Sequence, residues 1–182
     1  SVPYEETLGA YAPLIEAGKV RAVGASNLDA TQLRASLDAA AAHGLPRYDV
    51  LQTEYNLYAR EGFESGLADL TTAEDIGVVC YFGLARGFLS GKYRSEADLG
   101  QSARGGGVKD YLNDRGFRIL SALDAVAEAR GATQAEVALA WLAARPGVTA
   151  PIASATSVAQ VESLIRAASL ALSADDMRAL NE

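Results

Sequence analysis

The fold class is decided by residues 50–83, VLQTEYNLYAREGFESGLADLTTAEDIGVVCYFG. Short apolar runs, 50–55 and 78–82, stand near the two ends of this segment, as expected for strands. Between them, residues 63–74 place Phe63, Leu67 and Leu70 at helical spacing. Strands that are separated by helices pair in parallel through right-handed crossovers, so the segment predicts a β-α-β unit.

The same alternation continues in both directions along the chain. Further strands are expected at 20–26 and 149–154, and further helices at 5–16, 31–42 and 133–145. Glycines follow several expected helix ends, where left-handed backbone is often needed: Gly18, Gly44, Gly77 and Gly131. Pairs that resemble capping boxes stand at three expected helix starts: Thr133 with Glu136, Ser157 with Gln160, and Ser173 with Asp176. The predicted order is helix, strand, helix, strand, helix, strand, long loop, helices, strand, helices.

The predicted strands indicate a parallel α/β sheet, but they leave its architecture open. Nearly continuous apolar runs such as 77–83 predict burial on both faces of the sheet. Four such strands suit a small open sheet or half of an eight-stranded barrel, and periodicity alone does not decide between them. Residues 99–113, rich in glycine and charge, are expected to form a long loop that is functional or mobile.

Composition excludes several classes of protein. The chain has 182 residues, of which 49% are hydrophobic and 21% charged, as in an ordinary globular domain. A net charge of −7 with scattered basic residues argues against nucleic acid as a partner. No stretch approaches the roughly 18 apolar residues of a membrane span, and residues 1–11 do not resemble a signal peptide. A single cysteine, Cys80, fits a cytoplasmic location.

No stand-alone motif predicts a catalytic residue or a metal site. The one histidine, His43, stands beside Gly44 and is expected to be a solvated helix-end residue. Cys80 is expected to be a small core residue, and no Cys/His spacing indicates a metal. The glycines at 105–107 do not fit a dinucleotide fingerprint, because no strand-turn-helix surrounds them.

Polar and aromatic residues gather at the carboxyl ends of the predicted strands, the edge where parallel α/β proteins bind ligands. Each has a structural alternative: Asn27 as a turn former, Gln52 as a buried group bonded to a neighbouring strand, Tyr81 as an aromatic at the rim of the core. Four successive strand ends of this kind favour a binding site. The residues are Ser26, Asn27, Gln52, Glu54, Asn56, Tyr81, Ser154 and Thr156.

These groups suit a nicotinamide nucleotide. A side-chain amide both donates to and accepts from a carboxamide, and a tyrosine face stacks on a ring. Backbone N–H groups of a glycine-containing loop, together with Arg86 and Lys92, suit phosphates. The helix start at Ser157 also favours an anion.

Four stretches resemble aldo-keto reductases, closest to the bacterial branch related to potassium-channel β subunits. They are GKVRAVGASN (18–27), LQTEYNL (51–57), YFGLARGFLSGKY (81–93) and VTAPIASATSVAQVESL (148–164). The resemblance implies that residues 1–182 form the C-terminal half of a (β/α)8 TIM barrel, the side that binds NADP, with the N-terminal catalytic half absent.

The resemblance also implies roles for individual residues. Ser26, Asn27 and Gln52 would hold the nicotinamide carboxamide, and Tyr81 would stack on the nicotinamide ring. The pyrophosphate loop would comprise Phe82, Gly83, Leu84, Arg86, Gly87 and Lys92. The adenosine ribose and its 2′-phosphate would be approached by Ser154, Thr156 and Gln160.

The chain departs from the family pattern in several places. Phe82-Gly83 stands where Ser-Pro is usual, Ser163-Leu164 where Glu-Asn is usual, and Ser154 where glycine is common. Basic contacts to the 2′-phosphate are not obvious, and Arg104 with Lys109 are hypothesised to supply them. The family's Asp, Tyr, Lys and His tetrad lies on the first half of the barrel, and no residue here takes those roles.

Two functions follow from the resemblance. In the first, the complete protein reduces a small aldehyde or ketone with NADPH, and the isolated chain is inactive. In the second, the chain is a stand-alone half-barrel that binds nucleotide in a regulatory role without catalysis. Its open edges would be completed by a second copy or by a separate N-terminal half.

Overall fold

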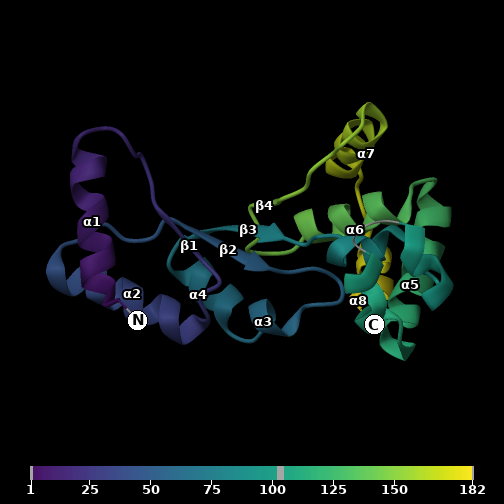
Figure 1. Ribbon diagram of the computed structural model, residues 1–182, viewed down its shortest axis with the longest axis horizontal. Coiled ribbons are helices and arrows are strands. Elements are labelled where there is room, and N and C mark those ends of the chain that lie inside the picture. Colours follow the sequence, from purple (N-terminus) through teal and green to yellow (C-terminus); the bar gives the residue numbers. More distant parts are fainter. Residues whose placement is uncertain (1, 102–104, 182) are drawn as a thin grey trace.

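The computed structural model describes residues 2–101 and 105–181. Helices α1 and α2 lie at one end of the molecule, the sheet runs through the middle, and α5, α6 and α8 lie at the other end (Figure 1). The first part comprises α1 (Tyr4–Glu16), β1 (Gly24–Ser26), α2 (Ala30–His43), β2 (Val50–Glu54), α3 (Glu61–Glu64), α4 (Leu67–Ala73) and β3 (Gly77–Tyr81). Three 3₁₀ helices follow: η1 (Ala85–Ser90), η2 (Glu96–Gln101) and η3 (Gly105–Tyr111). The last part comprises α5 (Asp114–Arg130), α6 (Gln134–Ala143), β4 (Ala150–Pro151), α7 (Val158–Ser169) and α8 (Ala174–Asn181).

The sheet confirms the predicted fold class. Its four strands are all parallel and lie in the order β1-β2-β3-β4, so each strand pairs with its neighbour in the sequence. A doubly wound sheet needs a point at which the strand order reverses, whereas a barrel wall advances in one direction. The sheet is therefore a parallel α/β sheet with the strand order of a partial barrel.

The two faces of the sheet differ in burial. On one face Leu51, Val78 and Cys80 are buried, and they join the hydrophobic core. On the other face Gln52 and Tyr81 are half-buried. Right-handed crossovers that all advance in the same direction place their helices on one side of a sheet. The expectation of burial on both faces was therefore wrong for the strands of this chain.

Several predicted helix boundaries are confirmed by their caps. Gly44 and Gly131 end α2 and α5 in left-handed conformation, each with φ of 61°. The boxes Thr133–Glu136 and Ser173–Asp176 form with both hydrogen bonds. A further capping box, which was not predicted, forms between Asp29 and Gln32 at the start of α2.

Other local predictions were wrong, each for a physical reason. Gly77 is not a helix stop: it begins β3, and Asp75 takes the left-handed conformation after α4, with φ of 52°. The single helix expected over 63–74 is two helices, because Gly66 interrupts it with φ of 102°. The loop expected over 99–113 contains η3, in which Val108 is fully buried.

The outer strands are shorter than predicted. Residues 20–23, 149 and 152–154 fall outside β1 and β4, each of which pairs with one strand within the described residues. Within the described ranges, no helix combines the length and the apolar character that a membrane crossing requires.

Candidate cofactor site

Four of the predicted site residues meet at the carboxyl ends of β1, β2 and β3. Ser26 is the register partner of Gln52, and the Asn27 N–H donates to the Gln52 carbonyl at 3.0 Å. The Tyr81 hydroxyl donates to Asn27 Oδ1 at 2.7 Å. Asn27 holds φ of 59°, a left-handed conformation that asparagine tolerates better than most residues. The sheet register thus brings Ser26, Asn27, Gln52 and Tyr81 together.

The hydrogen bond between Tyr81 and Asn27 fixes what the amide offers to a ligand. Because Oδ1 accepts from the phenol, the amide nitrogen of Asn27 remains as a donor, and it meets no acceptor among the described residues. Partial burial, with the nearby Glu54 carboxylate, raises the pKa of Tyr81. The hydroxyl therefore stays protonated at neutral pH and keeps donating to Asn27.

The loop after β3 adopts an unusual backbone that a buried asparagine supports. Phe82, Ala85 and Arg86 all have positive φ, at 54°, 45° and 59°. The amide of Asn56, which is fully buried, donates to the Phe82 carbonyl at 3.0 Å, and its oxygen accepts from the N–H groups of Tyr58 and Ala59. Asn56 thus ties the loop after β2 to the loop after β3. Its position at a strand end was noted from the sequence, but its supporting role was not predicted.

The same loop carries groups that suit phosphate. Arg86 lies 5.2 Å from the centre of the Phe82 ring, and the Lys92 ammonium lies 5.0 Å from that of Tyr93. In the described ranges neither cation has a carboxylate partner, and the N–H groups of Gly83 and Leu84 have no acceptor. Backbone donors beside unpaired cations form an anion-binding arrangement.

Arg104 and Lys109 were hypothesised to supply basic contacts to the 2′-phosphate. The Lys109 ammonium lies 3.4 Å from a Glu96 carboxylate oxygen, so its charge is already matched within the chain. Arg104 lies outside the described residues.

The third predicted group, Ser154, Thr156 and Gln160, is exposed. The Thr156 N–H and hydroxyl both donate to Gln160 Oε1, at 2.7 and 3.1 Å. Gln160 therefore closes the turn before α7 instead of completing a full capping box with Ser157. Among the described residues, no hydrogen bond joins this group to Asn27, Gln52 or Tyr81.

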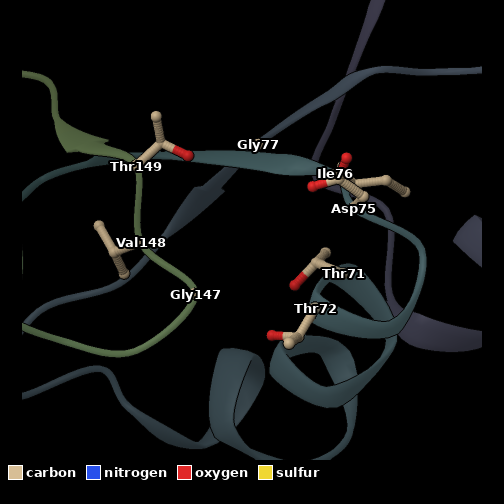
Figure 2. Close-up of a pocket in the computed structure, with 8 residues that line it drawn as sticks. All are labelled: Thr71, Thr72, Asp75, Ile76, Gly77, Gly147, Val148 and Thr149. Carbon is tan, nitrogen blue, oxygen red and sulfur yellow. The ribbon is translucent and has the colours of Figure 1, made fainter.

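One cavity lies away from this edge of the sheet. It has a volume of about 310 Å³ and lies where β3 and β4 begin, and Figure 2 shows Thr71, Thr72 and Thr149 around it. The hydroxyls of Thr71 and Thr72 bond to carbonyls of their own helix. In barrels the amino ends of the strands serve stability, whereas chemistry takes place at the carboxyl ends.

Comparison with known proteins decides the family. The model of the Aldo/keto reductase family matches residues 1–182. The chain belongs to the aldo/keto reductase family. This aldo-keto reductase chain is 32% identical over 184 residues to an aldo-keto reductase of Fusarium vanettenii, covering 100% of the chain and 49% of that relative.

Two further comparisons agree on the family, and the first of them is also consistent with the branch related to potassium-channel β subunits. A protein of Arabidopsis thaliana named as a probable voltage-gated potassium channel subunit beta is 33% identical over 174 residues, which cover 92% of this chain and 52% of that protein. The crystal structure of a thermostable aldo-keto reductase in complex with the inhibitor epalrestat matches with a TM-score of 0.74 and 26% identity, over 99% of this chain and 54% of that one. The chain spans about half the length of the curated relatives it matches.

Proposed function

We propose that the complete protein reduces aldehydes or ketones with NADPH, and that residues 1–182 supply much of the cofactor site as the C-terminal half of the barrel. The observation that carries this proposal is the Tyr81–Asn27 hydrogen bond beside Gln52, because it places an aromatic face and an oriented amide at one strand edge. Membership of the aldo/keto reductase family supports the reaction class. A cytoplasmic location belongs to the same proposal.

Each group of residues has a distinct task. The ring of Tyr81 stacks on the nicotinamide, while the free amide nitrogen of Asn27, with Ser26 and Gln52, bonds to the carboxamide. The loop comprising Phe82, Gly83, Leu84, Arg86, Gly87 and Lys92 holds the pyrophosphate through backbone N–H groups and cations. Ser154, Thr156 and Gln160 contact the adenosine portion. The bound cofactor supplies the hydride.

The proton donor lies outside this chain, on the first half of the barrel. The half-buried face that carries Gln52 and Tyr81 is the one that the other barrel strands would cover. We therefore expect the isolated chain to show no carbonyl reductase activity. NADPH oxidation by the purified 182-residue chain with an aldehyde would contradict this assignment.

A second candidate function is a half-barrel module that binds nucleotide without turnover. It is favoured by the two outer strands, β1 and β4, each of which has one strand partner in the described sheet. Such edges pair with a separate N-terminal half or with a second copy. The mass of the purified polypeptide distinguishes the two candidate functions. A mass of 19.0 kDa per chain is consistent with the half-barrel module, and a mass about twice that per chain would contradict it.

Substitutions at Tyr81 test the cofactor site directly. In a titration with NADPH, Tyr81→Ala should weaken binding by about 1–3 kcal/mol, the scale of base–aromatic stacking. Tyr81→Phe keeps the ring and loses the bond to Asn27, so it should weaken binding less. Phe117→Ala removes an exposed aromatic from α5 and serves as the control. An unchanged Kd in Tyr81→Ala would mean that Tyr81 has only a structural role.

A further inference from the structure

A second cavity, of about 180 Å³, lies between the segment after β2 and helices α5 and α8. Helices α5 and α8 contact each other at the C-terminal end of the molecule (Figure 1). Arg60 lies just before α3. Arg115 and Arg118 lie on one face of α5, three residues apart. None of these residues belongs to the cofactor site described above.

The cavity concentrates positive charge in a chain whose net charge is −7. Three arginines line it, and no aspartate or glutamate among residues 2–101 and 105–181 does. Only Arg60 has its charge matched, by Glu64 at 3.0 Å, and that carboxylate also pairs with Arg145 at 3.1 Å. The lining therefore carries two guanidinium groups without a carboxylate partner in the described residues.

The two unmatched arginines differ in how firmly they are held. Arg115 donates to the Tyr58 carbonyl at 2.7 Å, and its guanidinium lies 4.7 Å from the centre of the Tyr58 ring. Both contacts fix its position without neutralising its charge. Arg118 is exposed and makes no hydrogen bond or ion pair within residues 2–101 and 105–181. A ligand anion would meet one arginine already positioned and one free to close on it.

Apart from the arginines and Asn181, the lining is apolar, which restricts the class of anion. Of the apolar residues, Leu57 and Leu180 are buried and Ile119 is half-buried. A volume of about 180 Å³ equals that of roughly six water molecules at ~30 Å³ each, enough for a carboxylate and a few methylene groups. A fully hydrated inorganic anion would leave these apolar walls without a partner.

We propose that this cavity binds an organic carboxylate with a short apolar chain, held by Arg115 and Arg118. Guanidinium groups match carboxylates with paired hydrogen bonds. The apolar chain lies against Leu57, Ile119 and Leu180. The site does not depend on nucleotide, because none of its residues lies in the loop after β3.

Calorimetric titration of the full protein with butanoate, without nucleotide, tests the site. Butanoate should bind, and Arg118→Gln should weaken its binding by about tenfold or more, the scale of a lost charged hydrogen bond. Arg118→Lys keeps the charge without the planar guanidinium, so its butanoate affinity should lie between those of the wild type and Arg118→Gln. Arg21→Gln removes another exposed arginine that has no partner in the described ranges, so its butanoate affinity should be unchanged.

Three results would overturn the proposal. The first is an absence of butanoate binding, and the second is butanoate binding that Arg118→Gln and Arg115→Lys both leave unchanged. The third is inorganic phosphate binding as tightly as butanoate, because that would remove the role of the apolar walls. Because every titration is done without NADPH, failure here leaves the proposed cofactor site untouched, and failure at Tyr81 leaves this site untouched.

Discussion

Tyr55 is the residue whose hydroxyl we expect to contribute most to stability. It follows β2 directly and is fully buried. Its hydroxyl donates to Glu64 Oε1 at 2.6 Å and accepts from Arg145 Nε at 2.8 Å. The two residues are 81 positions apart in the chain and also meet each other, at 3.1 Å. The phenol therefore joins the segment after β2, helix α3 and the end of α6.

The magnitude of Tyr55→Phe follows from these contacts. A hydrogen bond to a charged group contributes about 1.5–3 kcal/mol, and the substitution removes two of them. The pairing of Arg145 with Glu64 survives, and so does that of Arg60 with Glu64. Because both charged groups keep another partner, we expect a net loss of about 2 kcal/mol, which is below the sum for two such bonds and near the lower end of the range for one. For a chain of this size that corresponds to a fall in Tm of roughly 4–8 °C.

Urea denaturation at pH 7 measures the loss, with an unchanged m-value showing that the unfolding transition is comparable. Tyr11→Phe is the matched control, because the Tyr11 hydroxyl has no hydrogen-bond partner in the described ranges. If Tyr55→Phe costs no more than Tyr11→Phe, within about 0.5 kcal/mol, the hydroxyl does not join the three elements.

The effect should also depend on pH with a definite sign. Burial alone would raise the pKa of Glu64, but hydrogen bonds from Tyr55 and Arg60, with the charges of Arg60 and Arg145, outweigh it and lower the pKa. A carboxylate with a lowered pKa contributes stability above its ordinary pKa of about 4.3, and the contribution is lost as pH falls through the folded value. The difference in free energy of unfolding between wild type and Tyr55→Phe should therefore be greatest near pH 7 and should decrease below about pH 4.

Three further predictions concern the loops and the core. Gly116→Ala should lower the free energy of unfolding in urea by about 1–3 kcal/mol, because a Cβ there would clash with the Tyr111 carbonyl and come within 2.9 Å of a ring carbon of Phe88. Gly62→Ala is the control and should be neutral or stabilising, because nothing lies within 4 Å of a Cβ at that position. Cys80 is buried and burial raises its pKa to about 12, so a thiol reagent at pH 8 should modify it only after unfolding, and rapid labelling of the native protein would refute this. Asn56→Ala should lower stability by about 1–3 kcal/mol in urea and raise the Kd for NADPH, because the Phe82 carbonyl loses its buried donor; a change in stability alone would separate Asn56 from the cofactor loop.

The order of elements could be predicted because its signals are local. A period near 3.6, a capping pair such as Thr133–Glu136, and a left-handed glycine such as Gly131 each act within one turn of helix. Where a competing local signal was overlooked, the prediction failed: Gly66 was not recognised as the break between α3 and α4. The predicted strand lengths were wrong for a different reason. A strand continues only as far as a neighbouring strand pairs with it, and the extent of that pairing is set by tertiary structure.

The candidate site was likewise predictable only where the signals are local or follow from the order of the strands. Residues at the ends of β1, β2 and β3 could be grouped from the sequence because parallel strands end at a common edge. The bond between Tyr81 and Asn27 joins residues 54 positions apart, and no local pattern encodes it. The left-handed backbone of Phe82 and Ala85 was equally hidden, because neither residue type favours positive φ.

The departure from the family at Ser163 has a structural explanation that bears on nucleotide choice. The Ser163 hydroxyl and the Arg166 guanidinium both donate to Glu136 Oε1 at 2.8 Å, and this buried carboxylate anchors α7 to α6. Burial alone would raise the pKa of Glu136, yet hydrogen bonds from the Thr133 backbone, Ser163 and Arg166 lower it, so the carboxylate stays charged at neutral pH. Arg166 is the one cation of α7, and Glu136 already neutralises it. A 2′-phosphate near the start of α7 would thus find no unmatched side-chain cation on this helix.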